Sequence, residues 1–351
     1  MKILVTGGSG FIGSALIRYI LTQTEHSVIN VDKLTYAGSE ISLSSITNLP
    51  GYQFEYADIC DHDEIVRILE IYQPDTIINL AAESHVDRSI DDAGNFIQTN
   101  IVGVYSLLDA SNKYYQQLSP SKQARFRFHQ VSTDEVYGDL NQDDQEIFTE
   151  TSRYQPSSPY SASKAGADHL VRAWHRTYGL PVVISSSSNN FGPYQFPEKL
   201  IPLTVLNAIE GKALPVYGDG SQIRDWLYVE DHVTALLKVS CEGKIGETYN
   251  ISAGELHTNL SVVELICSIL QKLRPIEQHY KLLIQFVDDR PGHDIQYASS
   301  ADKAKRDLAW KPIMPFETGM LNTVNWYINN IGWCIKIQHQ VYQRERLGLP
   351  N

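Results

Sequence analysis

Five side chains that could move protons lie between residues 131 and 164. Tyr160 and Lys164 are four residues apart, so in a helix they lie on one face. A nearby ammonium favours the phenolate form of a tyrosine, which predicts that Tyr160 acts as a base near neutral pH. Tyr-x-x-x-Lys pairs are also common on solvated helices, so this spacing alone does not identify a catalytic pair.

The run Thr133-Asp134-Glu135 strengthens the catalytic interpretation. It follows the apolar residues 126–131, which predict a strand, and ligands bind beyond the carboxyl ends of strands in an open parallel sheet. Two adjacent carboxylates there are candidates for separate acid and base roles. We therefore predict one catalytic site made of these three residues, Tyr160 and Lys164.

A glycine-rich turn near the N-terminus is a candidate cofactor site. Gly7, Gly10 and Gly13 follow an apolar strand and begin a helix, where glycine lets the backbone approach a pyrophosphate. The spacing differs from Gly-x-Gly-x-x-Gly, so the turn could instead only pack the helix on the strand. Asp32 ends the next strand, where a carboxylate accepts a hydrogen bond from a ribose 2′-hydroxyl and repels a 2′-phosphate. These features predict NAD rather than NADP.

Alternating strands and helices position these groups. Strands are expected at 3–6, 27–31, 52–56, 76–80, 126–131 and 181–184, and helices at 63–72, 94–116 and 160–178. This order predicts an α/β fold with a Rossmann-type, doubly wound parallel sheet. The apolar surface of the last two helices predicts either core packing or a homodimer in which they pair across a two-fold axis.

A smaller, partly discontinuous C-terminal substrate lobe is expected after residue 186. The polar run 185–190 and the turn formers at 191–197 interrupt the alternation. We predict an NAD-binding domain at 1–186 with return segments around 229–251, a mainly substrate-binding lobe at 187–330 and a tail at 331–351. Within the lobe we expect a hairpin-like turn at 218–220, helices at 229–240 and 261–273, and a strand at 248–251.

Arg224 and Arg290 are the candidates for binding a diphosphate, since a guanidinium fork matches phosphate oxygens. The alternative is that both are surface arginines in solvated ion pairs. His85 lies in a polar loop after the fourth strand, and we expect it to shape the site rather than to act as a catalyst.

The composition excludes several classes of protein. A net charge of −12 over 351 residues argues against a general nucleic-acid surface. No segment reaches the roughly 18 consecutive apolar residues of a membrane span, and the start lacks the pattern of a signal peptide. The four cysteines have neither metal nor disulfide spacing. We predict a cytoplasmic protein without a metal.

The motifs resemble the extended short-chain dehydrogenase/reductase superfamily and, within it, dehydratases of nucleotide hexoses. The similarity is carried by residues 6–13, 32–38, 80–90, 132–138, 156–165, 188–202 and 218–232. The run Thr133-Asp134-Glu135 is the more specific motif, because related sugar-nucleotide enzymes usually lack the carboxylate pair. Serines at 185–188 and Phe191 depart from the family pattern.

The resemblance implies a redox-neutral dehydration, with dTDP-glucose as the implied substrate, although the residues leave thymine and uracil open. Tyr160, assisted by Lys164 and Thr133, would take the C4 hydroxyl proton while hydride passes to NAD. Glu135 would remove the C5 proton, Asp134 would protonate the departing C6 hydroxyl, and hydride would return to C6. Asp134 must then be kept protonated by burial and by the charge of Glu135. The alternatives are a 4-epimerase, a decarboxylase or a non-catalytic dinucleotide sensor.

The resemblance also implies two sets of binding residues. The cofactor set is Gly7, Gly10, Phe11, Ile12, Gly13, Asp32, Lys33, Leu34, Thr35, Asp58, Ile59, Leu80, Ala81, Ala82, Ser84, Thr99, Tyr160, Lys164 and Asn190. The substrate set is Ser84, Thr133, Asn189, Lys199, Leu200, Pro215, Tyr217, Arg224, Asn259, Arg290 and His293.

Overall fold

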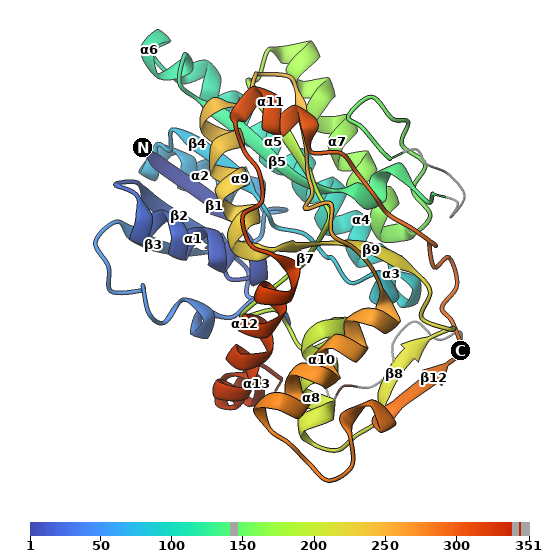
Figure 1. Ribbon diagram of the computed structural model, residues 1–351. Coiled ribbons are helices and arrows are strands. Elements are labelled where there is room, and N and C mark those ends of the chain that lie inside the picture. The colour runs from blue at the N-terminus through green and yellow to red at the C-terminus, as the bar shows by residue number, and fades with distance from the viewer. Residues whose placement is uncertain (141–146, 339–343, 345–351) are drawn as a thin grey trace.

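A seven-stranded parallel sheet forms the centre of the larger lobe (Figure 1). The computed structural model describes residues 1–140, 147–338 and 344. The strand order is β10-β6-β5-β4-β1-β2-β3, and all neighbours are parallel. The strands are β1 (Lys2–Thr6), β2 (Ser27–Asp32), β3 (Tyr52–Tyr56), β4 (Thr76–Asn79), β5 (Arg127–Thr133), β6 (Val182–Ser187) and β10 (Thr248–Ile251). The predicted doubly wound sheet is confirmed, and its order reverses between β1 and β4, where such folds bind ligands.

Alternate side chains of the strands build one apolar core on each face of the sheet. In β1, Leu4 joins the core that contains α2 (His62–Tyr72), α5 (Val104–Gln117) and α7 (Pro159–Tyr178). Its neighbours Ile3 and Val5 join the opposite core, with α1 (Phe11–Gln23) and α9 (Val229–Glu242). This period of two is the pattern of a strand buried on both faces. The segment around 229–251, which was predicted to return to this domain, supplies α9, which packs on the sheet, and β10, which is one of its strands.

Local sequence signals fix the helix that carries Tyr160. Ser158 and Ser161 form a reciprocal capping box at the start of α7, and Pro159 occupies its first turn. Gly179 ends the helix with a φ of 74°. Tyr160 therefore lies in the first turn, and Lys164 lies one turn later on the same face.

The long helix predicted at 94–116 is helical throughout, but it is not a single α-helix. The segment consists of α4 (Ala93–Ile97), a π-helical turn (Gln98–Gly103) and α5. Within the wide turn, the Asn100 side chain accepts a hydrogen bond from the Glu83 N–H (2.9 Å) and donates to the Ser163 hydroxyl (2.8 Å). Because Glu83 and Ser163 lie outside this segment, the helical period of its own residues did not indicate these hydrogen bonds or the π-helical turn.

The C-terminal lobe has its own core, which is built from α8 (Leu200–Ile209), α10 (Asn259–Leu273), α12 (Phe316–Asn329) and two small sheets. One sheet has the order β11-β9-β7, and the other pairs β12 with β8. The strands are β7 (Asn189–Phe191), β8 (Leu214–Tyr217), β9 (Ile223–Tyr228), β11 (Leu256–Thr258) and β12 (Ile284–Val287). The remaining helices are α3 (Val86–Asp91), α6 (Pro120–Gln123), α11 (Asp302–Leu308) and α13 (Ile331–Gln338), and 3-10 turns occupy Glu40–Leu43, Asp134–Tyr137 and Tyr280–Leu283.

Two further expectations for this region require correction. The turn at 218–220 joins no hairpin, because β8 pairs in parallel with the distant β12 rather than with β9. The polar run begins inside β6, where the buried Ser185 hydroxyl lies 2.8 Å from a ring nitrogen of His129. The bounds of the C-terminal tail stay a prediction. Its described part contains the helix α13, whose Trp333 contacts the rings of Tyr194 and Trp326.

Candidate active site

One cavity lies at the carboxyl edge of the large sheet and extends to the start of α8. It is lined by all five predicted catalytic residues, Thr133, Asp134, Glu135, Tyr160 and Lys164. It is also lined by the predicted cofactor residues Gly7, Gly10, Phe11, Ile12, Gly13, Asp32, Lys33, Thr35, Asp58, Ile59, Leu80, Ala81, Ala82, Ser84, Thr99 and Asn190. The structure thus brings the glycine turn and the candidate catalytic residues to one site.

Glycine is needed for different physical reasons at the three positions of the turn. A Cβ on Gly13 would lie 2.2 Å from the Gly7 oxygen, and one on Gly7, whose φ is +67°, would lie 2.6 Å from the Ala81 nitrogen. Packing of α1 on the sheet therefore explains these two positions by itself. Gly10 has more room, since its nearest such contact is 3.3 Å, and it lies at the N-cap of α1, where unpaired N–H groups favour an anion.

Asp32 is held by the backbone around it. Its carboxylate accepts hydrogen bonds from the N–H groups of Ser9 (2.9 Å) and Leu34 (2.8 Å). Burial raises its pKa, although these two bonds oppose the shift. Leu34 itself does not line the cavity, and its backbone N–H supports Asp32, so its direct contact with the cofactor stays a prediction. Lys33 is paired with Asp58 at 3.1 Å.

The Tyr160 and Lys164 side chains do not have the predicted electrostatics in this structure. The pKa of Tyr160 is raised, first by burial and then by the charge of Glu135, and not lowered by an ammonium. Lys164 donates to the Val131 carbonyl at 2.7 Å, and burial lowers its own pKa to about 8. A hydrogen bond with the Thr133 side chain favours the Tyr160 phenolate. The prediction from spacing ignored desolvation, which dominates here.

The two carboxyl groups have the environments that divided acid and base roles require. Asp134 is 1% exposed, and burial followed by the charges of Glu135 and Asp225 raises its pKa well above its usual value. The predicted neutral state of Asp134 is therefore supported. Burial also raises the pKa of Glu135, but Arg290, Arg224 and Lys199 oppose that shift and stabilise the ionised form.

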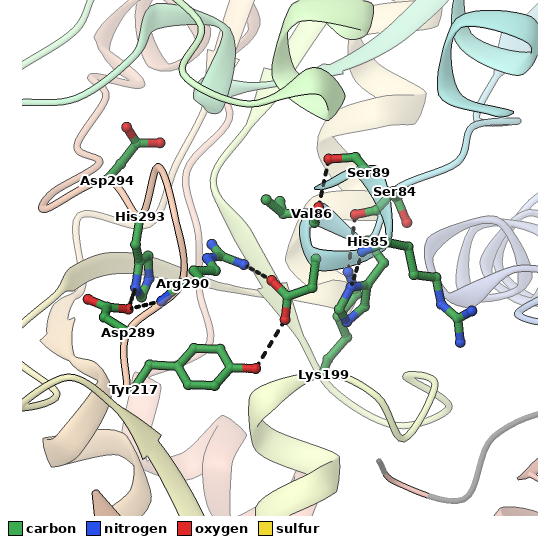
Figure 2. Close-up of polar contacts among 12 residues, drawn as sticks. Ser84, His85, Val86, Ser89, Lys199, Tyr217, Asp289, Arg290, His293 and Asp294 are labelled. Carbon is green, nitrogen blue, oxygen red and sulfur yellow. Dashed lines mark hydrogen bonds and ion pairs between the residues drawn. The ribbon is translucent and has the colours of Figure 1, made fainter. Parts of the chain in front are cut away.

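The predicted substrate residues divide into two groups. Ser84, Thr133, Asn189 and Lys199 line the cavity, and the Lys199 ammonium donates to the Ser84 carbonyl at 3.1 Å (Figure 2). The others lie outside its lining: Leu200, Pro215, Tyr217, Arg224, Asn259, Arg290 and His293. For these seven residues a direct contact with a ligand stays a prediction.

Neither arginine lies in a solvated surface pair, so that alternative is wrong. Arg224 is 5% exposed, donates to the Asp294 carbonyl at 2.8 Å and lies 4.3 Å from the centre of the Tyr297 ring. The Arg290 side chain is 17% exposed and pairs with Asp87 at 2.5 Å.

Sequence reasoning missed Glu198 and Asp87. Glu198 lines the cavity, is buried, and accepts hydrogen bonds from Tyr36 (3.1 Å) and Arg88 (3.0 Å). For Glu198 the only local signal was its position next to Lys199. Asp87 and its neighbour Arg88 lie in the motif at residues 80–90, where the residue types alone did not indicate a role. His85 is buried at the N-cap of α3, and burial and nearby cations hold its pKa well below the usual value, which agrees with a shaping role.

Two further searches concern only the described part of the chain. Within residues 1–140, 147–338 and 344, no helix is long and apolar enough to span a membrane. No group of three or more histidine, cysteine, aspartate or glutamate side chains in these ranges could hold a metal ion.

The fold and the cavity are those of a nucleotide-sugar-modifying α/β protein, and the chain belongs to the family described as GDP-mannose 4,6 dehydratase, whose model matches residues 4–323. Among its relatives, a protein of Neisseria meningitidis serogroup B named dTDP-glucose 4,6-dehydratase is 57% identical over 351 residues, with 99% of each chain covered. A protein of Salmonella typhimurium with the same name is 57% identical over 350 residues, covering 98% of this chain and 97% of that one.

Solved structures similar to this chain include two enzymes with the same name and a related epimerase. The dTDP-glucose 4,6-dehydratase of Bacillus anthracis in complex with NAD is 42% identical, with a TM-score of 0.84 over 96% of this chain and 99% of that chain. The corresponding enzyme of Streptomyces venezuelae, with NAD and TYD bound, is 40% identical, with a TM-score of 0.87 over 96% of this chain and all of that one. A UDP-glucose 4-epimerase of Thermotoga maritima is 27% identical, with a TM-score of 0.82 over 94% and 100%.

Proposed function

We propose that the protein is a dTDP-glucose 4,6-dehydratase, a hydro-lyase of deoxysugar biosynthesis that uses NAD. It converts dTDP-glucose into dTDP-4-keto-6-deoxy-glucose. The observation that carries this proposal is the buried carboxyl group of Asp134 beside the partly buried Glu135, in the same cavity as Tyr160. The relatives with this name at 57% identity over nearly the full chain support the same activity.

The cavity fits NAD. Gly10 at the N-terminus of α1 suits a pyrophosphate, and the Asp32 carboxylate lines the same cavity. NAD, when bound, accepts a hydride and returns it. The neighbouring structures from Bacillus anthracis and Streptomyces venezuelae contain NAD, which supports this assignment.

Each proton step is assigned to a side chain of the cavity. The Tyr160 oxygen takes the proton of the C4 hydroxyl, with a hydrogen bond from Thr133 stabilising the phenolate, and Lys164 lines the same cavity. The C4 ketone acidifies C5, so the Glu135 carboxylate can remove the C5 proton and leave an enolate. Asp134, kept neutral by burial and by Glu135, gives its proton to the C6 hydroxyl, which leaves as water. The C6 carbon then receives the hydride and C5 regains a proton, so no net oxidation occurs.

The rival functions do not require this set of groups. A 4-epimerase or decarboxylase uses a base at the tyrosine but needs no neutral acid and ionised base beside it. A dinucleotide sensor needs neither, and burial of the Asp134 carboxyl group beside a second carboxylate costs free energy. The environment of Asp134 and Glu135 therefore favours dehydration.

We also propose a cytoplasmic homodimer that binds its nucleotide sugar but neither nucleic acid nor membrane. Apolar side chains on the candidate helices are exposed in the monomer: Ile97 (46%), Val102 (39%), Tyr105 (50%) and Tyr178 (52%). Burial of such a face in a two-fold interface would remove it from water. A solution mass near twice 39.6 kDa is the expected result, and a stable monomer would contradict the pairing.

NAD is expected to remain bound through purification. Because the hydride leaves and returns within one turnover, cofactor release is not part of the cycle. Denaturing the purified protein should release NAD, which mass spectrometry identifies. Recovery of NADP alone would contradict the argument from Asp32, whose carboxylate lies where a 2′-phosphate would be repelled.

Incubation with dTDP-glucose tests the proposed function itself. We expect a 4-keto-6-deoxy product by NMR without added reductant or oxidant. UDP-glucose serves as the matched control for the base. A product that keeps its C6 hydroxyl, or no product from a chain that contains NAD, would sink the proposal.

A further inference from the structure

The Asp87 carboxylate connects the two lobes beside the active site. Asp87 lies in α3 of the larger lobe and is 5% exposed. One of its oxygens accepts from Arg290 Nη1 at 2.5 Å, and the other accepts from the Tyr217 hydroxyl at 3.1 Å. Figure 2 shows Tyr217 and Arg290 reaching toward the same carboxylate from the C-terminal lobe. Both partners were predicted to bind substrate, but Asp87 was not.

Asp87 engages only one part of the Arg290 guanidinium. Among the residues that the structure describes, the buried Nε atom of Arg290 has no hydrogen-bond partner. A guanidinium presents its N–H groups as a planar fork, so holding Nη1 on one side fixes the direction in which Nε points. A buried N–H group without an acceptor is unfavourable, and a phosphate oxygen is a strong acceptor for it.

The guanidinium of Arg290 acts on one of the candidate catalytic groups. Together with Arg224 and Lys199 it opposes the rise in the pKa of Glu135, and Glu135 and Lys199 line the cavity. His293 comes from the same loop as Arg290 and is held by Asp289 at 2.6 Å (Figure 2).

We infer that Asp87 is a positioning residue that holds Arg290 by Nη1 so that its remaining N–H groups bind the terminal phosphate of a nucleoside diphosphate. This inference rests on the proposed function, since it assumes a dTDP-sugar. Asp87 itself touches neither substrate nor reacting atoms. Its two oxygens bind two donors at once, whereas an asparagine at this position keeps only one acceptor atom.

The experiment compares binding of dTDP and dTMP to the full chain with its cofactor, by calorimetry. The two probes differ by the phosphate that Arg290 is inferred to bind. Asp87→Asn should reduce the preference for dTDP by about tenfold, the size of one charge-assisted hydrogen bond, and leave dTMP affinity nearly unchanged. Arg290→Ala should reduce the preference by at least as much, and adding Asp87→Asn to it should have no further effect on the ratio.

Asp63→Asn is the matched control, because it makes the same substitution at a fully exposed carboxylate on α2, outside the cavity lining. It should keep most of the preference for dTDP. If Asp87→Asn does not fold, Asp87→Glu keeps the charge but displaces the carboxylate by one methylene, and the same loss of preference is expected.

The results separate positioning from a merely structural role. Equal losses of dTDP and dTMP affinity would mean that Asp87 only holds the lobes together, and would overturn the inference. An unchanged or increased preference for dTDP in the folded variants would also overturn it. If the unaltered chain does not distinguish dTDP from dTMP, the proposed nucleotide-sugar site fails first, and the inference fails with it.

Discussion

Tyr160→Phe is expected to lower the turnover of dTDP-glucose by about 10² to 10⁴-fold, the range for loss of a positioned acid or base. The substitution removes the oxygen that takes the C4 proton, and every later step requires the C4 ketone. Phenylalanine keeps the ring, whose centre lies 6.3 Å from the centre of the Phe96 ring, so folding and cofactor content should persist. Absorbance of bound NADH in a single turnover measures the first step directly, and it should not rise.

Tyr56→Phe is the control, because this tyrosine is 68% exposed on β3 and lies outside the cavity lining. It should leave turnover unchanged. Normal formation of NADH in Tyr160→Phe would show that another group accepts the C4 proton, and the assignment of Tyr160 would have to be abandoned.

Glu135→Gln and Asp134→Asn form a matched pair whose effects should differ in kind. Each should reduce product formation by about 10² to 10⁴-fold. Glu135→Gln removes the base at C5 but leaves oxidation at C4, so bound NADH should accumulate and C5 should not exchange with solvent. Asp134→Asn keeps a neutral group in the buried position and removes the proton for the C6 hydroxyl, so C5 exchange should continue while elimination slows.

The two variants are distinguished by NADH absorbance and by deuterium at C5 of the recovered sugar. The electrostatics of the pair are consistent with the expected difference. Burial raises the pKa of both groups, well above the usual value for Asp134, whereas Arg290, Arg224 and Lys199 oppose the shift at Glu135. Full activity of Glu135→Gln would remove it as the base. Identical behaviour of both variants would mean that the acid and base roles are not divided.

Features governed by short stretches of sequence could be predicted. The sheet, the glycine turn and the capped helix of Tyr160 depend on residue periods, glycines and caps within one element, and the structure contains all three. The partition of β1 between two cores follows from a period of two. The five candidate catalytic residues share a cavity because strand ends and helix starts meet at one sheet edge.

The features that could not be predicted from the sequence depend on residues that are distant in the chain. Asp87 and Arg290 are separated by 203 residues, and Arg88 and Glu198 by 110. Neither pair has a local signature. To predict that β6 continues through the polar Ser185, one must know that His129 lies beside it. To predict the direction of the pKa shift of Tyr160, one must know that the side chain is buried. Residue types indicated which chemistry was available but not the desolvation that controls it.

The transfer of hydride within one sugar is the central claim, and isotope labelling tests it most directly. The substrate is dTDP-glucose with deuterium at C4, mixed with unlabelled dTDP-glucose that carries a ¹³C label, and the product is analysed by NMR and mass spectrometry. The proposed function predicts that deuterium moves from C4 to C6 of the same molecule and never enters the ¹³C product. In heavy water, solvent deuterium should enter C5. A product without deuterium at C6, or with deuterium at C6 of the ¹³C-labelled sugar, would contradict intramolecular dehydration.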